Sequence, residues 1–296
     1  MNNTQLTYKA IIPDEGTLLR DILSSKLLLS QSLVVRLKHQ SKIKVNGNPT
    51  HINYCVHAGD MITVDMDLTE ESKIVPEPLP LDIVYEDADF LVVNKPAGLS
   101  THPSHLGGTG TLANAVTYYW QELGRNNLFR PINRLDKETS GLVLIGNSQF
   151  AHQAIFKQLK GHKIERQYIA LVEGVVAKDN DCIDQPIARQ GDTRRRIVHP
   201  DGDPAITHYK VLRKYLGHTI LSLRLETGRT HQIRVHLSFI GNPICGDLLY
   251  GSASPLIERQ GLHANKLCFI HPRTGKEVIL EVPLAADMQT AIDHLV

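Results

Sequence analysis

Asp136 stands where a polar turn leads into a buried strand. The stretch RPINRLDKETSGLVLIGNS, residues 130–148, passes from Arg134 and Asp136 through a polar turn into the apolar run 142–145. The stretch contains no histidine or cysteine that could act with the carboxylate. Any partner that keeps Asp136 ionised and oriented for chemistry must therefore come from elsewhere in the chain.

Arg229 is the candidate for that partner. In LETGRTHQIR it follows a predicted strand and Gly228, at the start of a predicted helix. A cation is unfavourable there because a helix N-terminus already carries partial positive charge, so Arg229 needs an anion. A pair with Asp136 would lower the pKa of the carboxyl group and fix its orientation. The alternative is that Asp136 caps its own turn and Arg229 pairs with Glu226.

Two further groups of residues carry weaker signals. The segment RQGDTRRRIVHP holds Arg194, Arg195 and Arg196 in a predicted loop, which can contact an RNA backbone or be simply solvated. His231 and His236 are five residues apart, a poor spacing for a metal on one helix. We expect both histidines to be structural.

Composition excludes several classes of protein. The chain has 296 residues, 42% hydrophobic and 21% charged, as in an ordinary globular protein. Its net charge of +1 indicates no particular partner. The cysteines form no C-x-x-C pair, which argues against zinc and thioredoxin-like sites and indicates free thiols in a reducing cytoplasm; they are Cys55, Cys182, Cys245 and Cys268. We find no signal sequence or membrane-spanning run.

An acidic, proline-rich stretch divides the chain. Residues 68–80, LTEESKIVPEPLP, read as a linker between a small unit, residues 1–70, and a large one, residues 81–296. In the small unit, GTLLRDILSSKL and SQSLVVRLKHQSKI predict two helices, the second with Ser30 or Ser32 as N-cap. Strands are predicted around turns at residues 46–47 and 59–60.

The large unit mixes strands and helices. Strands are predicted in IVYEDADFLVVNK, IERQYIALVEG, PAITHYKVLRKY and TILSLRLETG. Helices are predicted in TLANAVTYYWQELG, FAHQAIFKQLKG and RTHQIRVHLSFIG, with Gly124 and Gly241 as stops for the first and third. Because strands seldom alternate one-for-one with helices, we predict an α+β fold with a large, mostly antiparallel mixed sheet flanked by helices.

Several motifs in order resemble those of the RluA-type RNA pseudouridine synthases. They are YEDADFLVVNKPAGLSTHP, NRLDKETSGLVL, ERQYIALVEG, TGRTHQIRVHLSFIGNPICGD and LHANKLCFIHPRTGKEVILEVPL, over most of residues 80–290. The resemblance implies a catalytic role for Asp136, with Arg229 as its ion-pair partner and Tyr168 packed against the target base.

The same resemblance implies contacts to the substrate. Arg134 would help to displace the target base, Arg166 would be the basic residue that precedes the tyrosine, and Leu267 would be an apolar wall of the pocket. The chain departs from the family at Asn133, where the family usually has histidine. An asparagine can still form hydrogen bonds, so the change leaves activity expected and puts RNA preference in question.

The small unit resembles the S-four RNA-binding module over roughly residues 14–68. The Leu-rich first helix, IKVNG and HAGDMI carry this resemblance. It implies that basic side chains of the second helix and the next strand contact RNA phosphates; these are Arg36, Lys38, Lys42 and Lys44.

Together these patterns predict a cytoplasmic RNA:uridine isomerase that acts on ribosomal or transfer RNA. Isomerisation oxidises nothing and imports no group, so we expect no metal or cofactor. Two alternatives stay open: a non-catalytic RNA-binding or ribosome-assembly protein that keeps the fold, and a nucleoside hydrolase, which would need a second pocket carboxylate or a calcium site. Our working expectation for the oligomeric state is a monomer.

Overall fold

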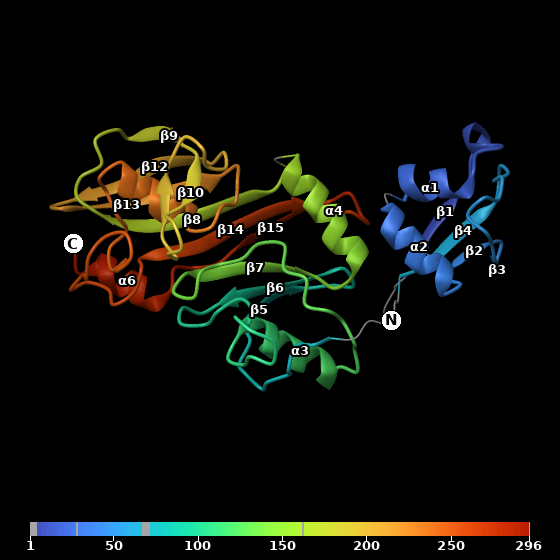
Figure 1. Ribbon diagram of the computed structural model, residues 1–296, viewed down its shortest axis with the longest axis horizontal. Coiled ribbons are helices and arrows are strands. Elements are labelled where there is room, and N and C mark those ends of the chain that lie inside the picture. Colours follow the sequence, from blue (N-terminus) through green and yellow to red (C-terminus); the bar gives the residue numbers. More distant parts are fainter. Residues whose placement is uncertain (1–4, 28, 67–71, 162, 296) are drawn as a thin grey trace.

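The N-terminal unit is a small sheet covered by two helices (Figure 1). The computed structural model describes residues 5–27, 29–66, 72–161 and 163–295. The sheet has the order β1-β4-β2-β3 and is antiparallel throughout. Both predicted helices are confirmed, and Ser30 caps the second by accepting a hydrogen bond from Leu33 N. The elements are β1 (Gln5–Lys9), a 3-10 turn (Ile12–Asp14), α1 (Leu19–Ser25), α2 (Gln31–His39), β2 (Ile43–Val45), β3 (Asn48–Pro49) and β4 (Met61–Asp65).

The remainder of the chain is built on a nine-stranded sheet. Its order is β5-β6-β7-β14-β8-β13-β12-β9, with β15 also paired to β14. The β7–β14 pairing is parallel and the others are antiparallel, which confirms the predicted α+β class. The elements are β5 (Ile83–Glu86), β6 (Phe90–Lys95), α3 (Leu112–Glu122), β7 (Ser140–Gly146), α4 (Gln149–Lys160), β8 (Glu165–Glu173), β9 (Asn180–Asp184), β10 (Ile187–Arg189), β11 (Arg196–Val198), β12 (Ile206–Tyr215), β13 (His218–Leu225), α5 (Gln232–Phe239), β14 (Leu262–Ile270), β15 (Glu277–Glu281) and α6 (Ala286–Asp293).

The central strands are buried on both faces. In β7, Val143 and Ile145 join the core that packs under α3 and α5, whereas Leu142 and Leu144 join the core under α4. Successive side chains of a strand point to opposite faces, so a strand covered on both sides needs an unbroken apolar run. This explains why the run after Asp136 shows no alternation with polar residues.

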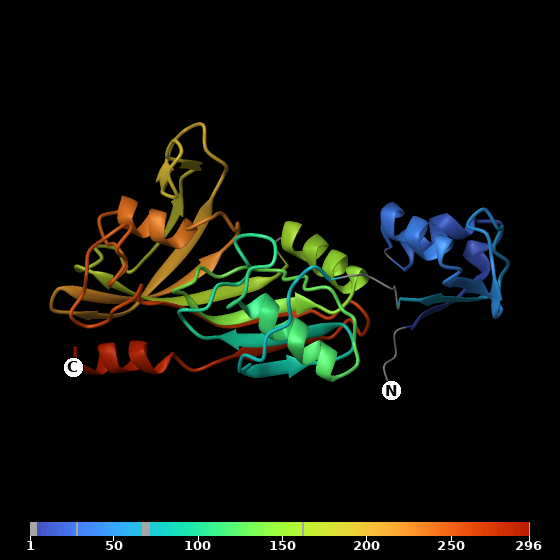
Figure 2. The same ribbon diagram turned by 60° about the horizontal axis from the view of Figure 1, so that its bottom comes forward.

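Helices and a hairpin cover the two faces of the sheet. Helix α5 lies on one face and α6 on the other, and the two-stranded hairpin β10–β11 projects on the α5 side (Figure 2). Within the described residues, no helix is both long and apolar enough to cross a membrane.

Several elements differ from the sequence-based expectations. Helix α5 begins at Gln232, three residues later than the predicted start, and Arg196 opens strand β11 instead of lying in a loop. Strands β1, β9, β10, β14 and β15 and helix α6 were not predicted. These elements are short or lack a clear period, so they depend on their neighbours in the fold for stability.

The predicted linker is partly attached to the large unit. Residues 72–80 contain no helix or strand, and residues 67–71 lie outside the described part of the chain. Asn114, in the first turn of α3, donates a 2.7 Å hydrogen bond to Val75 O and accepts a 3.2 Å bond at its backbone oxygen from Glu77 N. The second half of the linker is therefore hydrogen-bonded to the first turn of α3.

Candidate active site

Asp136 lies in the turn Leu135–Thr139, which other parts of the chain hold in place. The turn closes on itself through a 3.1 Å bond from Thr139 N to Asp136 O. Lys95, Thr101 and Arg259 each donate a hydrogen bond to a different backbone carbonyl of the turn, at 3.2, 2.8 and 3.0 Å. Because these three residues come from distant segments, the position of the carboxylate is set by the tertiary fold.

Lys95 is the most deeply buried of these supports. Its ammonium group, fully buried at the end of β6, donates to the carbonyl oxygens of Pro96, Leu99 and Lys137 at 2.8, 2.7 and 3.2 Å. Burial lowers the pKa of Lys95. The three carbonyl acceptors match the three hydrogens of the charged form, so they oppose that effect and tie the Asp136 turn to β6.

Arg234 holds the carboxylate of Asp136. Its Nη1 donates to Asp136 Oδ2 at 2.8 Å, while its Nε and Nη2 form a fork on the buried Asp247 at 2.7 and 2.8 Å. The guanidinium also lies over the ring of Tyr250, 5.0 Å from the ring centroid. Burial alone would lower the pKa of Arg234, but the bonds to Asp247 and then to Asp136 outweigh it and raise that pKa. Arg234 is thus a fixed cation between two carboxylates.

The predicted pair of Asp136 with Arg229 is wrong. Arg229 is exposed, and its Nε donates to Pro204 O at 3.0 Å. Since α5 begins only at Gln232, Arg229 lies before the helix, whereas Arg234 lies in the first turn and points into the interior. A cation at this helix start needs an anion, and Arg234 has two, Asp136 and Asp247.

A cavity of about 920 Å³ opens in front of Asp136. Its walls come from the Asp136 turn, α4, β8, the end of β13 and the start of α5. The side chain of Asp136 is 31% exposed. Among the described residues, no donor lies within hydrogen-bonding distance of its second oxygen, Oδ1. One oxygen is therefore held by Arg234, and the other is left to the cavity.

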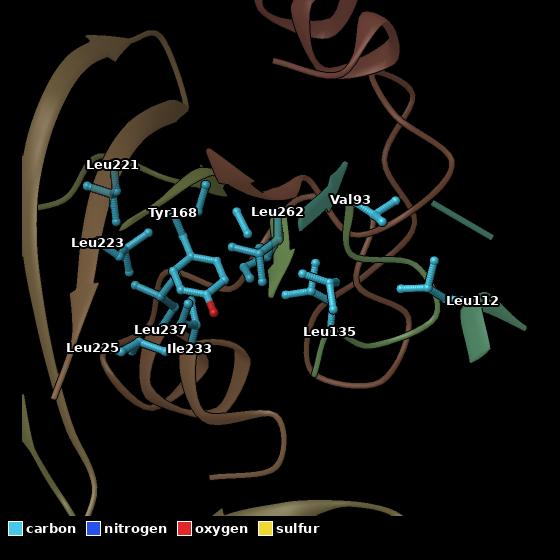
Figure 3. Close-up of a cluster of buried hydrophobic side chains, with 14 of the residues drawn as sticks. Val93, Leu112, Leu135, Tyr168, Leu221, Leu223, Leu225, Ile233, Leu237 and Leu262 are labelled. Atoms are coloured by element: carbon cyan, nitrogen blue, oxygen red, sulfur yellow. The ribbon is translucent and has the colours of Figure 1, made fainter. Parts of the chain in front are cut away.

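Tyr168 forms an apolar wall of this cavity. Figure 3 shows its ring between the leucines of β13, the α5 residues Ile233 and Leu237, and Leu262. The side chain is buried, and this burial raises the pKa of its hydroxyl, which stays protonated near neutral pH. A neutral aromatic ring beside a carboxylate suits a planar base as ligand.

Arginines line the same cavity at two depths. Arg134 is exposed and lines the cavity. Arg166 is buried and donates to Thr227 O at 3.2 Å. The structure thus brings Arg134, Arg166 and Tyr168 together around Asp136.

A comparison with protein families matches residues 89–239 to the family described as RNA pseudouridylate synthase. These residues contain the Asp136 turn, Tyr168 and Arg234. The chain belongs to this family. It is therefore an isomerase that converts uridine to pseudouridine in RNA, and the resemblance to the RluA-type branch is confirmed.

Relatives extend this similarity over most of the chain. An uncharacterized RNA pseudouridine synthase of Bacillus subtilis, YhcT, is 40% identical over 93% of this chain and 92% of its own. Ribosomal large subunit pseudouridine synthase D of Pasteurella multocida is 36% identical over 86% of this chain and 84% of its own. Among solved structures, human RNA pseudouridylate synthase domain containing 1 is 28% identical, with a TM-score of 0.58, over 70% of this chain and 84% of its own.

Asn133 lines the cavity as well as supporting β7, whereas Leu267 has a different place from the one predicted. The amide of Asn133 is buried, donates to Leu142 O at 3.0 Å and accepts from Leu144 N at 2.9 Å, so it continues the hydrogen bonding of β7. Leu267 belongs to the core formed with Ala151 and Ile155 of α4 and does not line the cavity. Leu262, at the start of β14, lines the cavity instead.

The predicted phosphate contacts divide into two groups. Arg36 donates to Gln149 Oε1 at 2.5 Å, and Lys42 pairs with Asp65 at 2.8 Å, so both already have partners in the protein. Lys38 and Lys44 are exposed. In the hairpin β10–β11, the connection carries the exposed Arg194 and Arg195, and Arg196 is half-buried.

Sequence reasoning missed four residues of the site: Arg234, Asp247, His231 and Tyr250. His236 is structural as expected, since it bonds to Thr207 and Gln185 inside the core. His231 is different, because it lines the cavity with Nε2 3.8 Å from Asp136 Oδ2. A signal for Arg234 was its position between Ile233 and Leu237 on the inward side of a helix, where a charge needs a buried partner.

Stability measurements should separate the two arginines of the TGRTHQIR motif. Arg234→Ala leaves Asp247 buried without its cation and should lower the free energy of unfolding by about 3–5 kcal/mol. Arg229→Ala removes an exposed side chain and should change it by less than about 0.5 kcal/mol. Urea unfolding of both variants, followed by circular dichroism, makes the comparison. Equal losses would contradict the assignment of Arg234 as the internal cation.

Proposed function

We propose that this chain isomerises uridines of ribosomal RNA with Asp136 as its one catalytic carboxylate and without a metal or cofactor. Relatives named as large-subunit pseudouridine synthases support ribosomal RNA over transfer RNA as the substrate. The observation that carries the catalytic role is the division of the Asp136 carboxylate, with one oxygen held by Arg234 and the other left to the cavity.

A single carboxylate is enough for this chemistry. The bond between C1′ of the ribose and N1 of uracil breaks, and its electron pair leaves with uracil as a delocalised anion. The base then turns and rejoins C1′ through C5, which afterwards loses its hydrogen. Asp136 acts on the sugar, either by attack on C1′ or by removal of the 2′ proton, and each route needs an ionised oxygen. Hydrolysis would need a second group to activate water.

Arg234 pairs with Asp136 but shares its positive charge with a second carboxylate. The guanidinium is shared with Asp247, so the three side chains carry a net charge of −1. Asp247 occupies the Nε–Nη2 fork and leaves Nη1 for Asp136, which fixes the direction of approach. The result is a charged, oriented carboxylate that still has electron density to share.

The target uridine must leave its stack to reach Asp136. A few kcal/mol are needed to unstack a base, and contacts in the pocket must supply them. Tyr168 packs against the extruded uracil, Arg134 at the rim helps to displace it, and Arg166 supports the wall below. Base–aromatic stacking of this kind stabilises binding by about 1–3 kcal/mol.

Affinity for the RNA comes from regions outside the cavity. We assign residues 1–70 as an S-four-like RNA-binding domain and residues 81–296 as the catalytic domain. Lys38 and Lys44, both exposed, are the phosphate contacts of the first, and Arg194 and Arg195 of the hairpin are those of the second. We retain the predictions of a monomer and of a cytoplasmic location, where ribosomal RNA would be met.

Replacement of the carboxylate tests the catalytic role. Conversion at C5 must release the hydrogen bound there, so RNA tritiated at C5 of uridine reports the reaction as label in water. Asp136→Asn should lower this release by at least about 10³-fold, since it removes the charged oxygen. Asp201→Asn, at a side chain 92% exposed, is the matched control and should release label as the wild type does. Unchanged release by Asp136→Asn would remove Asp136 from its role.

The salt dependence of RNA binding tests the N-terminal contacts. Each phosphate contact contributes about 0.7 to the slope of log K against log salt for single-stranded RNA, so Lys38→Gln combined with Lys44→Gln should reduce the slope by about 1.4. The control exchanges two exposed lysines elsewhere, Lys210→Gln with Lys276→Gln. Filter binding between 50 and 300 mM salt (about a sixfold range) gives the slopes. Equal slopes for both double variants would refute the RNA contact.

A further inference from the structure

His231 occupies a strained position at the mouth of the cavity. Its backbone is left-handed, with φ 59° and ψ 18°, a conformation that is uncommon for residues other than glycine, although asparagine, aspartate and histidine adopt it more often than the rest. It stands at the N-cap of α5, yet its side chain caps no backbone group of the helix. A strained residue that does not serve its own helix must serve something else, and its ring faces Asp136.

A hydrogen-bond chain fixes the proton of this imidazole. Arg196 N donates to the hydroxyl of Tyr250 at 2.8 Å, and that hydroxyl lies 2.8 Å from His231 Nδ1. Among the described residues, Nδ1 is the acceptor within reach of the tyrosine hydrogen, because the bond from Arg196 N is a donation to the oxygen. The hydroxyl therefore donates to Nδ1, and the ring proton is on Nε2.

The Nε2–H group faces the reaction centre. The side chain is 16% exposed and lines the cavity, with Nε2 3.8 Å from Asp136 Oδ2. That distance is too long for a hydrogen bond, and Oδ2 already accepts from Arg234 at 2.8 Å. Burial lowers the pKa of His231, so the ring stays neutral near pH 7 although Asp136 opposes the shift. A neutral donor is thus placed beside the catalytic oxygen, with no bond to it.

We propose that His231 is a second catalytic side chain, whose Nε2–H donates a hydrogen bond to the uracil of the target nucleotide as its bond to C1′ breaks. The electron pair of that bond passes to uracil, and the negative charge spreads over N1 and the carbonyl oxygens. A donor beside the carboxylate that acts at the sugar is close to the base leaving that sugar. No proton is transferred, so His231 needs no proton source. This role rests on the proposed function of Asp136.

The chain of contacts also links RNA binding to the donor. Arg196 and Arg195 belong to the hairpin β10–β11, and Arg195 lies over the ring of Tyr250 at 5.6 Å. The backbone of the hairpin therefore holds Tyr250, and Tyr250 holds the tautomer of His231. The hairpin β10–β11 and the imidazole of His231 are thus connected through Tyr250.

Two substitutions of His231 discriminate this role from a structural one. Asparagine tolerates the left-handed backbone and can accept from Tyr250 near the Nδ1 position, but it has no group at the Nε2 position. Glutamine can place an amide N–H near Nε2. We expect His231→Asn to lower kcat by about 10²–10³-fold with KM changed less than about threefold, as for loss of a preorganised donor. His231→Gln should retain at least about a tenth of wild-type kcat.

Tyr250→Phe provides an independent variant. Without the Tyr250 hydroxyl, the ring proton of His231 is no longer held on Nε2, so kcat should fall by about tenfold. The substitution should cause no further loss when combined with His231→Asn, since both act through one donor. His294→Asn, at the exposed histidine that follows α6 as its C-cap, is the matched control. Tritium release under saturating RNA gives kcat, and the thermal midpoint confirms that each variant is folded.

Specific results would overturn the role of His231. They are wild-type kcat in His231→Asn or in Tyr250→Phe, equal losses in the asparagine and glutamine variants, or additive losses in the double variant. If His231→Asn does not fold, the kcat of Tyr250→Phe alone tests the role of His231. Failure of the proposed function is distinct, because Asp136→Asn would then release tritium as the wild type does.

Discussion

The site depends on one buried cation shared by two carboxylates. Arg234 reaches Asp136 through Nη1 and Asp247 through Nε and Nη2, and it lies over the ring of Tyr250. A charge in this position is costly unless every donor is matched, and here three donors have carboxylate acceptors. The free-energy cost of burying the Arg234 charge is therefore offset only when both carboxylates are in place. This requires α5, the Asp136 turn and the segment after α5 to be in their native positions.

The scaffold around this interaction supplies position more than chemistry. Lys95, Thr101 and Arg259 hold the turn that carries Asp136, and β7 continues from that turn into a core covered on both faces. Asn133 extends the hydrogen bonding of β7 with its side chain. A carboxylate on a turn so firmly held has little freedom left to lose, which is the general advantage of preorganisation.

Much of this could be predicted from the sequence, because local patterns determine it. The apolar run 142–145, the helix stops and the family motifs led to the α+β fold, to Asp136 and to Tyr168. The partner of Asp136 could not be chosen so easily, since Arg229 and Arg234 lie in one motif and the choice depends on where α5 begins. His231 was expected to be structural and Tyr250 was not singled out, because their places depend on contacts between distant segments: Tyr250 bonds to both His231 and Arg196. Leu267 was misplaced because strand β14 was not predicted, so its faces could not be assigned.

Asp247 gives the most direct test of the central claim, because it contacts Arg234 and does not line the cavity. The single-turnover rate of tritium release by Asp247→Asn, with RNA affinity measured alongside, separates orientation of the Asp136 carboxylate from substrate binding. Without its fork partner Arg234 no longer holds Asp136 in one direction, so the rate should fall about 10²-fold while the Kd for RNA stays within about threefold. A wild-type rate in a folded Asp247→Asn protein would contradict the account.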